Sequence, residues 1–230
     1  MQTIAITGCN RGIGLEFVRQ YAATGCQVHA TCRDPGSAAE LASLASAHAN
    51  VQVHQLDVAE PDNIAQLAAD FGGQALDGII HNAGVYPAQS RQLDSLDTQS
   101  WLQAFQVNTI APALLTRALL PNLAAGTQKN VAVISSKVGS IDDNQSGGSY
   151  AYRSSKSAVN QVVKSLSIDL APKGIQVVSL HPGWVQTAMG GPNALITVET
   201  SVKGMRNILA NLTAQQSGQF FNYDGAPIAW

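Results

Sequence analysis

Charged residues are scarce in this chain: they make up 12% of its 230 residues, and the formal net charge is only −2. Without a basic excess, nucleic acid is not an expected partner. The three cysteines, Cys9, Cys26 and Cys32, cannot all pair and show no C-x-x-C spacing. They indicate neither a disulfide framework nor a metal site, and they favour a reducing compartment.

Long apolar runs are missing as well. No stretch approaches the ~20 apolar residues of a membrane-spanning helix. The amino terminus lacks the charged start and the apolar run of a signal peptide. We therefore expect a cytoplasmic protein with no membrane partner. The chain does have a 45% share of hydrophobic residues, which is enough to form one domain over residues 1–230.

Short apolar, β-branched runs alternate with longer segments of helical periodicity. The expected strands cover residues 3–7, 27–31, 51–56, 78–81, 131–135, 175–180 and 220–223. The expected helices include residues 37–49, 99–125 and 152–171, and one that begins near Thr197. This alternation predicts an α/β fold: a single-domain, Rossmann-type, doubly wound parallel sheet of about seven strands with helices on both faces.

The first predicted strand runs directly into a glycine-rich loop with the spacing G-x-x-x-G-x-G. Glycines let the chain turn tightly there and let a pyrophosphate approach the free N–H groups at the start of the next helix. An ordinary strand-to-helix turn can have the same composition, but the position in the first β-α turn favours nucleotide binding. The expected contacts are Gly8, Asn10, Arg11, Gly12, Ile13 and Gly14.

The end of the second strand indicates which dinucleotide is bound. In an NAD site a carboxylate near this point holds the ribose 2′-hydroxyl, whereas an arginine accommodates a 2′-phosphate. Cys32 stands where that carboxylate is expected, Arg33 follows it, and Arg11 flanks the same place. We expect Asp34 to turn outward into an Asp-Pro turn. The two arginines therefore favour NADP(H), although two solvated surface arginines would give the same sequence.

Other segments at predicted strand ends are expected to contact the nucleotide, because α/β sheets build their sites at the carboxyl edge. Asp57 is placed to accept from the adenine amino group, or it only ends a strand. The turn after residues 78–81 suits close packing beside the nucleotide, or is only a turn. The expected contacts are Asp57, Val58, Asn82, Ala83, Gly84, Pro182, Gly183, Val185 and Thr187.

Tyr152 and Lys156 form the pair that carries chemistry. At positions i and i+4 of a helix they share a face, and a nearby ammonium is expected to lower the pKa of the phenol toward a usable range. A chance helical pair has the same spacing. Ser136 ends the fifth strand. Asn108 lies inside an apolar helix, where its amide either bonds to backbone or holds a water.

Taken together and in order, these motifs resemble the short-chain dehydrogenases/reductases, over nearly the whole chain. The matching motifs are T-G-x-x-x-G-I-G from Thr7, Asp57, N-A-G from Asn82, Asn108, Ser136, Tyr152-x-x-x-Lys156 and Pro182-Gly183-x-x-x-Thr187. The segments 151–158 and 218–225 are similar to the C-factor/sniffer-type carbonyl reductases. One departure is that Ser136 and Tyr152 are three residues further apart than is common in the family.

In the family's usual serine position stands Gly139, so we expect a three-residue extension within residues 140–149. Ser135 and Ser149 remain alternatives to Ser136. By the resemblance, Tyr152 donates the proton, Lys156 lowers its pKa and binds the nicotinamide ribose, Ser136 bonds the substrate carbonyl, and Asn108 orders a relay water. Tyr152 and Lys156 are thus cofactor-binding residues too.

The resemblance implies an NADPH-dependent oxidoreductase that reduces an aldehyde, ketone or quinone, a small-molecule carbonyl substrate. Few residues separate Thr187 from the next helix, so an open site is expected, lined by Tyr86, Trp184 and Met189. A homodimer or homotetramer, paired through helices 99–125 and 152–171, is expected as well. The alternative is a non-catalytic NAD(P)-binding signalling or sensor protein of the C-factor type. An extended-family epimerase would have another glycine spacing and a longer carboxyl-terminal region.

Overall fold

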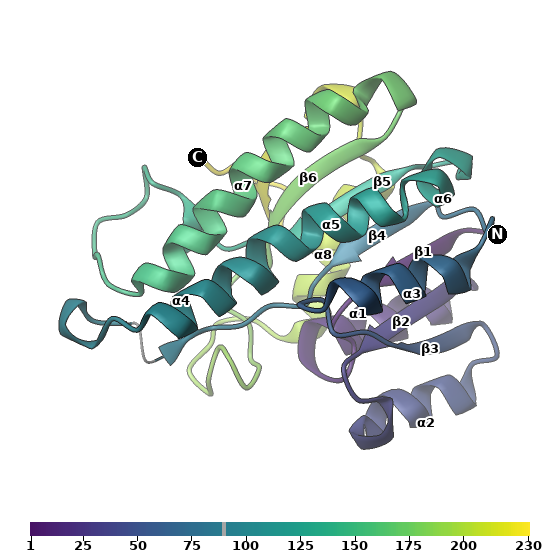
Figure 1. The fold of residues 1–230 in the computed structure, drawn as a ribbon, viewed down its shortest axis with the longest axis horizontal. Coiled ribbons are helices and arrows are strands. Elements are labelled where there is room, and N and C mark those ends of the chain that lie inside the picture. The colour runs from purple at the N-terminus through teal and green to yellow at the C-terminus, as the bar shows by residue number, and fades with distance from the viewer. Residues whose placement is uncertain (89–90) are drawn as a thin grey trace.

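The computed structural model describes residues 1–88 and 91–230. Within these residues, seven strands form one sheet in the order β3-β2-β1-β4-β5-β6-β7, and every neighbouring pair is parallel (Figure 1). The strands are β1 (Thr3–Ile6), β2 (Gln27–Cys32), β3 (Val51–Gln55), β4 (Gly78–His81), β5 (Asn130–Ile134), β6 (Gln176–His181) and β7 (Phe220–Asn222). Each bound lies within one residue of the predicted one.

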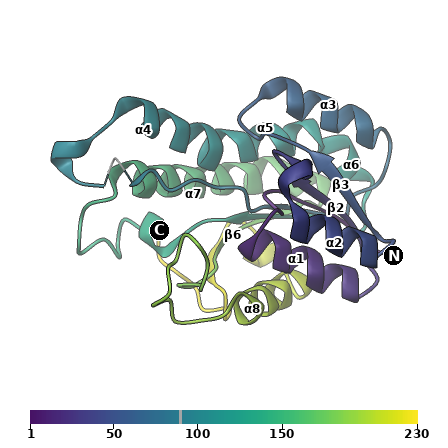
Figure 2. The same ribbon diagram turned by 90° about the horizontal axis from the view of Figure 1, so that it is seen from below.

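Helices cover both faces of the sheet (Figure 2). One face packs against α1 (Gly12–Ala23), α2 (Ala39–Ala47) and α8 (Val198–Ala210). The other packs against α3 (Pro61–Phe71), α5 (Ala111–Ala118), α6 (Leu120–Ala125) and α7 (Tyr150–Leu170). Successive strand residues face opposite cores, so Ile4 and Ile6 join the first and Ala5 joins the second,. The predicted doubly wound α/β fold is confirmed.

The single helix predicted over residues 99–125 is wrong in its continuity. The chain forms α4 (Thr98–Phe105), then a π-helical segment (Gln106–Ile110), then α5, and Leu119 separates α5 from α6. Pro112 is the physical reason for the first change, because it has no N–H to donate to the carbonyl of Asn108 and its ring crowds that carbonyl. A wider π turn accommodates both effects, and such turns are frequent at functional sites.

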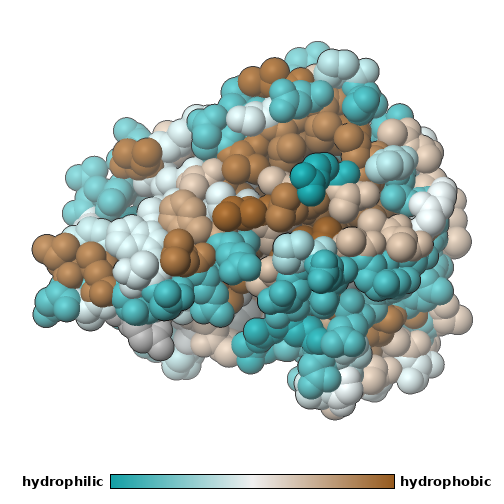
Figure 3. Space-filling view, viewed as in Figure 1, coloured by the Kyte–Doolittle hydropathy of each residue, from teal (hydrophilic) through white to brown (hydrophobic). Residues whose placement is uncertain are grey.

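Apolar residues gather on the surface around α5 and α7 in Figure 3. Leu102, Ile110 and Ile168 are large apolar side chains that are about half exposed or more, at 58%, 48% and 62%. The predicted pairing of subunits through these helices stays a prediction. None of the helices in the described part of the chain combines the length and the apolar character that a membrane span requires.

Candidate active site

The glycine loop after β1 packs so closely that side chains are excluded. Gly8 and Gly12 have φ values of 70° and 57°, a region that favours glycine. A Cβ on Gly14 would lie 2.2 Å from the carbonyl oxygen of Gly8 and 2.5 Å from Nδ2 of Asn82. The first turn of α1 therefore rests directly on the loop. Arg11 at the helix start provides no side-chain cap, so the first N–H groups of α1 remain free for an anion.

A second loop, after β4, holds the glycine loop in place. Oγ1 of Thr7 accepts hydrogen bonds from the backbone N–H groups of Asn82 and Ala83, both at 3.0 Å. In return, Nδ2 of Asn82 donates to the carbonyls of Thr7 and Gly8, at 2.9 and 3.0 Å. The sequence predicts close packing of residues 82–84 beside the nucleotide but indicates no separate role for Thr7. A hydroxyl residue at the end of β1, just before the glycines, was the available signal.

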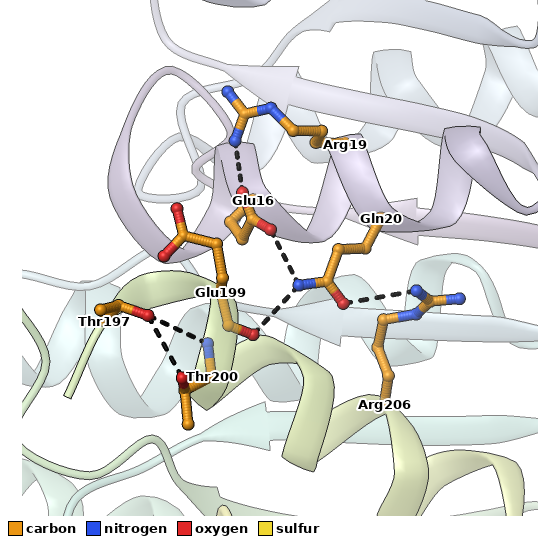
Figure 4. Close-up of polar contacts among 7 residues, drawn as sticks. All are labelled: Glu16, Arg19, Gln20, Thr197, Glu199, Thr200 and Arg206. Atoms are coloured by element: carbon orange, nitrogen blue, oxygen red, sulfur yellow. Dashed lines mark hydrogen bonds and ion pairs between the residues drawn. The ribbon is translucent and has the colours of Figure 1, made fainter.

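Helix α1 is also tied to α8 (Figure 4). Glu16 is buried, pairs with Arg19, and accepts a hydrogen bond from Gln20 at 2.8 Å. Gln20 also donates to the carbonyl of Glu199 at 3.2 Å and accepts from Arg206 at 3.4 Å. The helix that begins at the glycine loop is thus connected to the helix that follows residues 188–196.

The Pro-Gly segment after β6 lies against the glycine loop. A Cβ on Gly12 would lie 3.4 Å from Cγ2 of Thr187. Gly183 has a φ of 83°, and a Cβ there would lie 2.6 Å from Cδ1 of Ile196. Val185 is buried and forms a bridge to Ile196. Pro182 accepts a hydrogen bond from Ser201 in α8 at 2.5 Å. Because α8 begins directly after its capping residue Thr197, the segment over the site is short, as predicted.

Arg33 directly after β2 and Arg11 directly before α1 are exposed, and Cys32 at the end of β2 is buried. Asp34 accepts a hydrogen bond from the backbone N–H of Gly36 at 3.0 Å and so turns into its own Asp-Pro turn, as predicted. Among the described residues the ion pairs are Arg19–Glu16 and Lys137–Asp143. Neither Arg11 nor Arg33 is therefore neutralised by an ion pair within that part of the chain.

Asp57 has the structural role that the sequence left open. Its Oδ1 accepts from the N–H of Ala59 at 2.9 Å, and its own N–H donates to Oδ1 of Asn63 at 3.2 Å. Both bonds shape the turn between β3 and α3. Val58 packs against the core under α3. A contact of either residue with the adenine stays a prediction.

Of the three candidate serines, the structure places Ser136 against Tyr152. The side chain of Ser136 interacts with the Tyr152 phenol and acts to lower its pKa. Ser135 instead donates to Oδ1 of Asn160 at 2.7 Å in the protein interior, and Ser149 bonds to Tyr86. Gly139 packs on α7, where a Cβ would come within 2.7 Å of Lys156, and has no side chain to act.

The structure does not show the lowered pKa of Tyr152 that the neighbouring Lys156 predicts. Burial raises the pKa of Tyr152 to about 12, and the interaction with Ser136 opposes this only in part. Burial lowers the pKa of Lys156 to about 8. Its Nζ donates to the carbonyl of Ile134 at 2.8 Å and lies 5.7 Å from the centre of the Tyr152 ring. The two residues do share a face, but desolvation dominates the pKa of both.

Asn108 lies in the π-helical segment and is almost fully buried. Its Oδ1 accepts from the N–H of Val85 at 2.9 Å, and its Nδ2 donates to the Val85 carbonyl and to Ser155, both at 3.0 Å. Of the two alternatives for this amide, the structure therefore shows the one in which it bonds to the backbone. The amide fastens the loop after β4 to α7, and the relay water stays a prediction.

Two features of these loops suit a bound nicotinamide dinucleotide. A Cβ on Gly84 would lie 3.3 Å from Oδ1 of Asn108 and 3.8 Å from Nζ of Lys156, so the lack of a side chain there leaves Lys156 approachable. The uncapped start of α1 suits a pyrophosphate,. Trp184 and Met189, expected at the entrance, are 50% and 57% exposed.

Comparison with known proteins gives consistent matches. A family model described as short chain dehydrogenase matches residues 2–195. C-signal of Myxococcus xanthus is 43% identical over 155 residues, which are 67% of this chain and 93% of that protein. A 1-hydroxy-2-glutathionyl-2-methyl-3-butene dehydrogenase of Rhodococcus sp. (strain AD45) is 34% identical over 236 residues, the full length of both.

Solved structures agree with these sequence matches. The carbonyl reductase Sniffer of D. melanogaster superposes with a TM-score of 0.94 at 40% identity, over all of both chains. An NADPH-bound carbonyl reductase from chicken fatty liver superposes with a TM-score of 0.94 at 38% identity, over 100% of this chain and 99% of that one.

Proposed function

Because this chain belongs to the short-chain dehydrogenases/reductases, in their C-factor/sniffer branch, we propose that it is an NADPH-dependent carbonyl reductase. It reduces an aldehyde, ketone or quinone to the alcohol, and residues 1–230 act as one cofactor-binding and catalytic domain. The observation that carries the proposal is the placement of Ser136 beside the Tyr152 phenol, with Lys156 one helical turn away, at the carboxyl edge of the sheet.

Tyr152 is the proton donor. Reduction needs its phenol protonated, and a pKa near 12 keeps the proton on Oη throughout the neutral range. The bound dihydronicotinamide supplies a hydride to the carbonyl carbon. Ser136 and Tyr152 then donate hydrogen bonds to the oxygen where negative charge develops. The ammonium of Lys156 lies close enough to stabilise the phenolate that is left, and it holds the nicotinamide ribose.

The glycine loop and the uncapped N–H groups at the start of α1 would hold the pyrophosphate of the dinucleotide,. Arg11 and Arg33 bind the 2′-phosphate that distinguishes NADPH from NADH. The conformation of Asp34 supports this preference, since its carboxylate accepts from the N–H of Gly36 in its own Asp-Pro turn. The NADPH-bound chicken carbonyl reductase, at 38% identity, supports it as well.

The substrate site is open and tolerant. The segment between Thr187 and α8 is short, and the exposed side chains of Trp184 and Met189 provide apolar contact without enclosing a ligand. Small carbonyl compounds with an apolar or aromatic part fit such a site better than large polar ones.

Oxidation of NADPH and of NADH is measured against a panel of aldehydes, ketones and quinones, with wild type, Tyr152→Phe and Tyr150→Phe. Tyr150 is a partly exposed neighbour with a serine, not a lysine, four residues on. We expect NADPH to be preferred, Tyr152→Phe to lose about 10²–10⁴-fold in turnover, and Tyr150→Phe to retain it. Full turnover by Tyr152→Phe would refute the proton-donor role.

A non-catalytic signalling or sensor protein is the second candidate, because C-signal is 43% identical over two thirds of this chain. Such a protein has no use for a buried lysine beside a serine–tyrosine pair. It would bind NADPH without oxidising it in the presence of any carbonyl in the panel, and Tyr152→Phe would then change nothing.

A further inference from the structure

The turn that leads into α7 has an unusual backbone. Gly147, Gly148 and Ser149 follow one another with φ values of 63°, 66° and 48°. The first two are glycines, for which this region is accessible, but Ser149 carries a Cβ and pays a conformational cost there. Ser149 occupies the capping position of α7, yet its hydroxyl makes no capping bond. Something else must stabilise this residue.

Tyr86 provides that contact. Its hydroxyl lies 2.8 Å from Oγ of Ser149, within hydrogen-bond distance. The N–H of Ser149 also donates to the carbonyl of Arg91 at 2.7 Å. The segment after β4 therefore holds the start of α7 from two sides, and the serine hydroxyl that normally caps a helix is used to join two loops instead.

The same tyrosine also touches Tyr152. The two rings meet edge to face, with centroids 4.9 Å apart and an interplanar angle of 66°, which is a favourable aromatic arrangement. Tyr152 lies three residues after Ser149 and is held by Ser136 on another side. One side chain thus packs on the phenol ring and fixes the turn from which that ring projects.

We propose that Tyr86 is a positioning residue for Tyr152: its ring sets the orientation of the phenol, and its hydroxyl, bonded to Ser149, fixes the left-handed turn before α7. This inference rests on the proposed function of Tyr152 as proton donor. A proton donor loses efficiency steeply when it is displaced from its productive orientation. A residue that only lined the substrate site would instead alter substrate affinity.

The two contacts can be separated by substitution. Tyr86→Phe keeps the ring and removes the hydroxyl, whereas Tyr86→Leu removes both. Ser149→Gly removes the other end of the bond while suiting the left-handed backbone, so the turn should still fold. We expect kcat to fall on the order of tenfold in Tyr86→Phe and Ser149→Gly and further in Tyr86→Leu, with KM nearly unchanged.

Two comparisons make the kinetic test specific. The double variant Tyr86→Phe/Ser149→Gly should be no slower than either single variant, because both remove the same bond. Tyr150→Phe, a tyrosine in the first turn of the same helix, should match wild type. Additive losses in the double variant, or a rise in KM with kcat unchanged, would overturn the positioning role.

A measurement independent of turnover completes the test. Titration of ¹³C-labelled tyrosine by NMR, with Tyr152→Phe to assign the signal, reports the pKa of the Tyr152 phenol. Charge repulsion from the Tyr86 side chain contributes to the raised pKa of Tyr152, so the midpoint should move to lower pH in Tyr86→Leu, which removes that phenol. An unchanged midpoint would refute the positioning role of Tyr86, whether or not wild type reduces a carbonyl. Failure of wild type to reduce any carbonyl would instead refute the proposed function.

Discussion

Thr7 offers a quantitative test of how the nucleotide loop is held. In Thr7→Val the shape of the side chain is kept while Oγ1, the acceptor for the N–H groups of Asn82 and Ala83, is lost. The N–H of Asn82 retains a second acceptor, the carbonyl of Ile80 at 3.1 Å. The N–H of Ala83 has no second acceptor within the described part of the chain, so its loss of Oγ1 is the main cost.

An unsatisfied, partly buried donor costs about 1–3 kcal/mol. At this chain length, each kcal/mol corresponds to about 2–4 °C in Tm, so Thr7→Val should melt about 2–12 °C below wild type. NADPH should also bind more weakly, because the loop after β4 no longer holds the glycine loop in register. Differential scanning fluorimetry and fluorescence titration of NADPH measure the two effects.

Thr7→Ser is the matched control, because it keeps the hydroxyl and loses only a methyl group. It should retain the NADPH affinity and most of the Tm. Equal Tm and equal NADPH affinity in Thr7→Val and Thr7→Ser would refute the reasoning, since the acceptor would then contribute nothing.

Three further predictions follow. Lys156 loses its charge as the pH rises through about 8, so kcat for reduction should be level below that pH and fall above it, and the fall should be absent in the residual activity of Lys156→Met. Burial lowers the pKa of His81 to about 3. Below about pH 6.5, His81 therefore binds a proton in the unfolded chain but not in the folded chain. The free energy of unfolding should decrease by several kcal/mol as the pH falls from 6.5 to 3. In urea titrations, His81→Gln should decline less. Arg33→Ala should weaken NADPH binding about 10–100-fold, as expected for a charge-assisted hydrogen bond, and leave NADH binding unchanged; equal losses for both in calorimetry would contradict the 2′-phosphate role.

Strand positions and the order of motifs could be predicted from the sequence because both are local. Alternation of β-branched runs with helical periodicity places each strand to within one residue. The turn of Asp34 and the short segment before α8 depend on nearby residues only, and the structure places both as expected.

What the sequence could not supply depends on contacts between distant segments. The interruption at 106–110 follows from Pro112, yet its π geometry depends on packing of Asn108 against Val85 and α7. The neighbouring lysine predicts a lowered pKa for Tyr152, whereas burial by the surrounding segments raises it. The hydrogen bond between Tyr86 and Ser149 joins residues 63 positions apart, and no local sequence pattern predicts it.

The central claim is that Tyr152 delivers the proton in a hydride transfer from NADPH. Its most direct test is a single turnover, in which a preformed complex of enzyme and NADPH is mixed with a reactive carbonyl and the loss of reduced-nicotinamide absorbance is followed. We expect a transient about 10²–10⁴-fold slower in Tyr152→Phe than in wild type, with the Kd for NADPH within a few-fold. Equal transients with equal NADPH binding would contradict it.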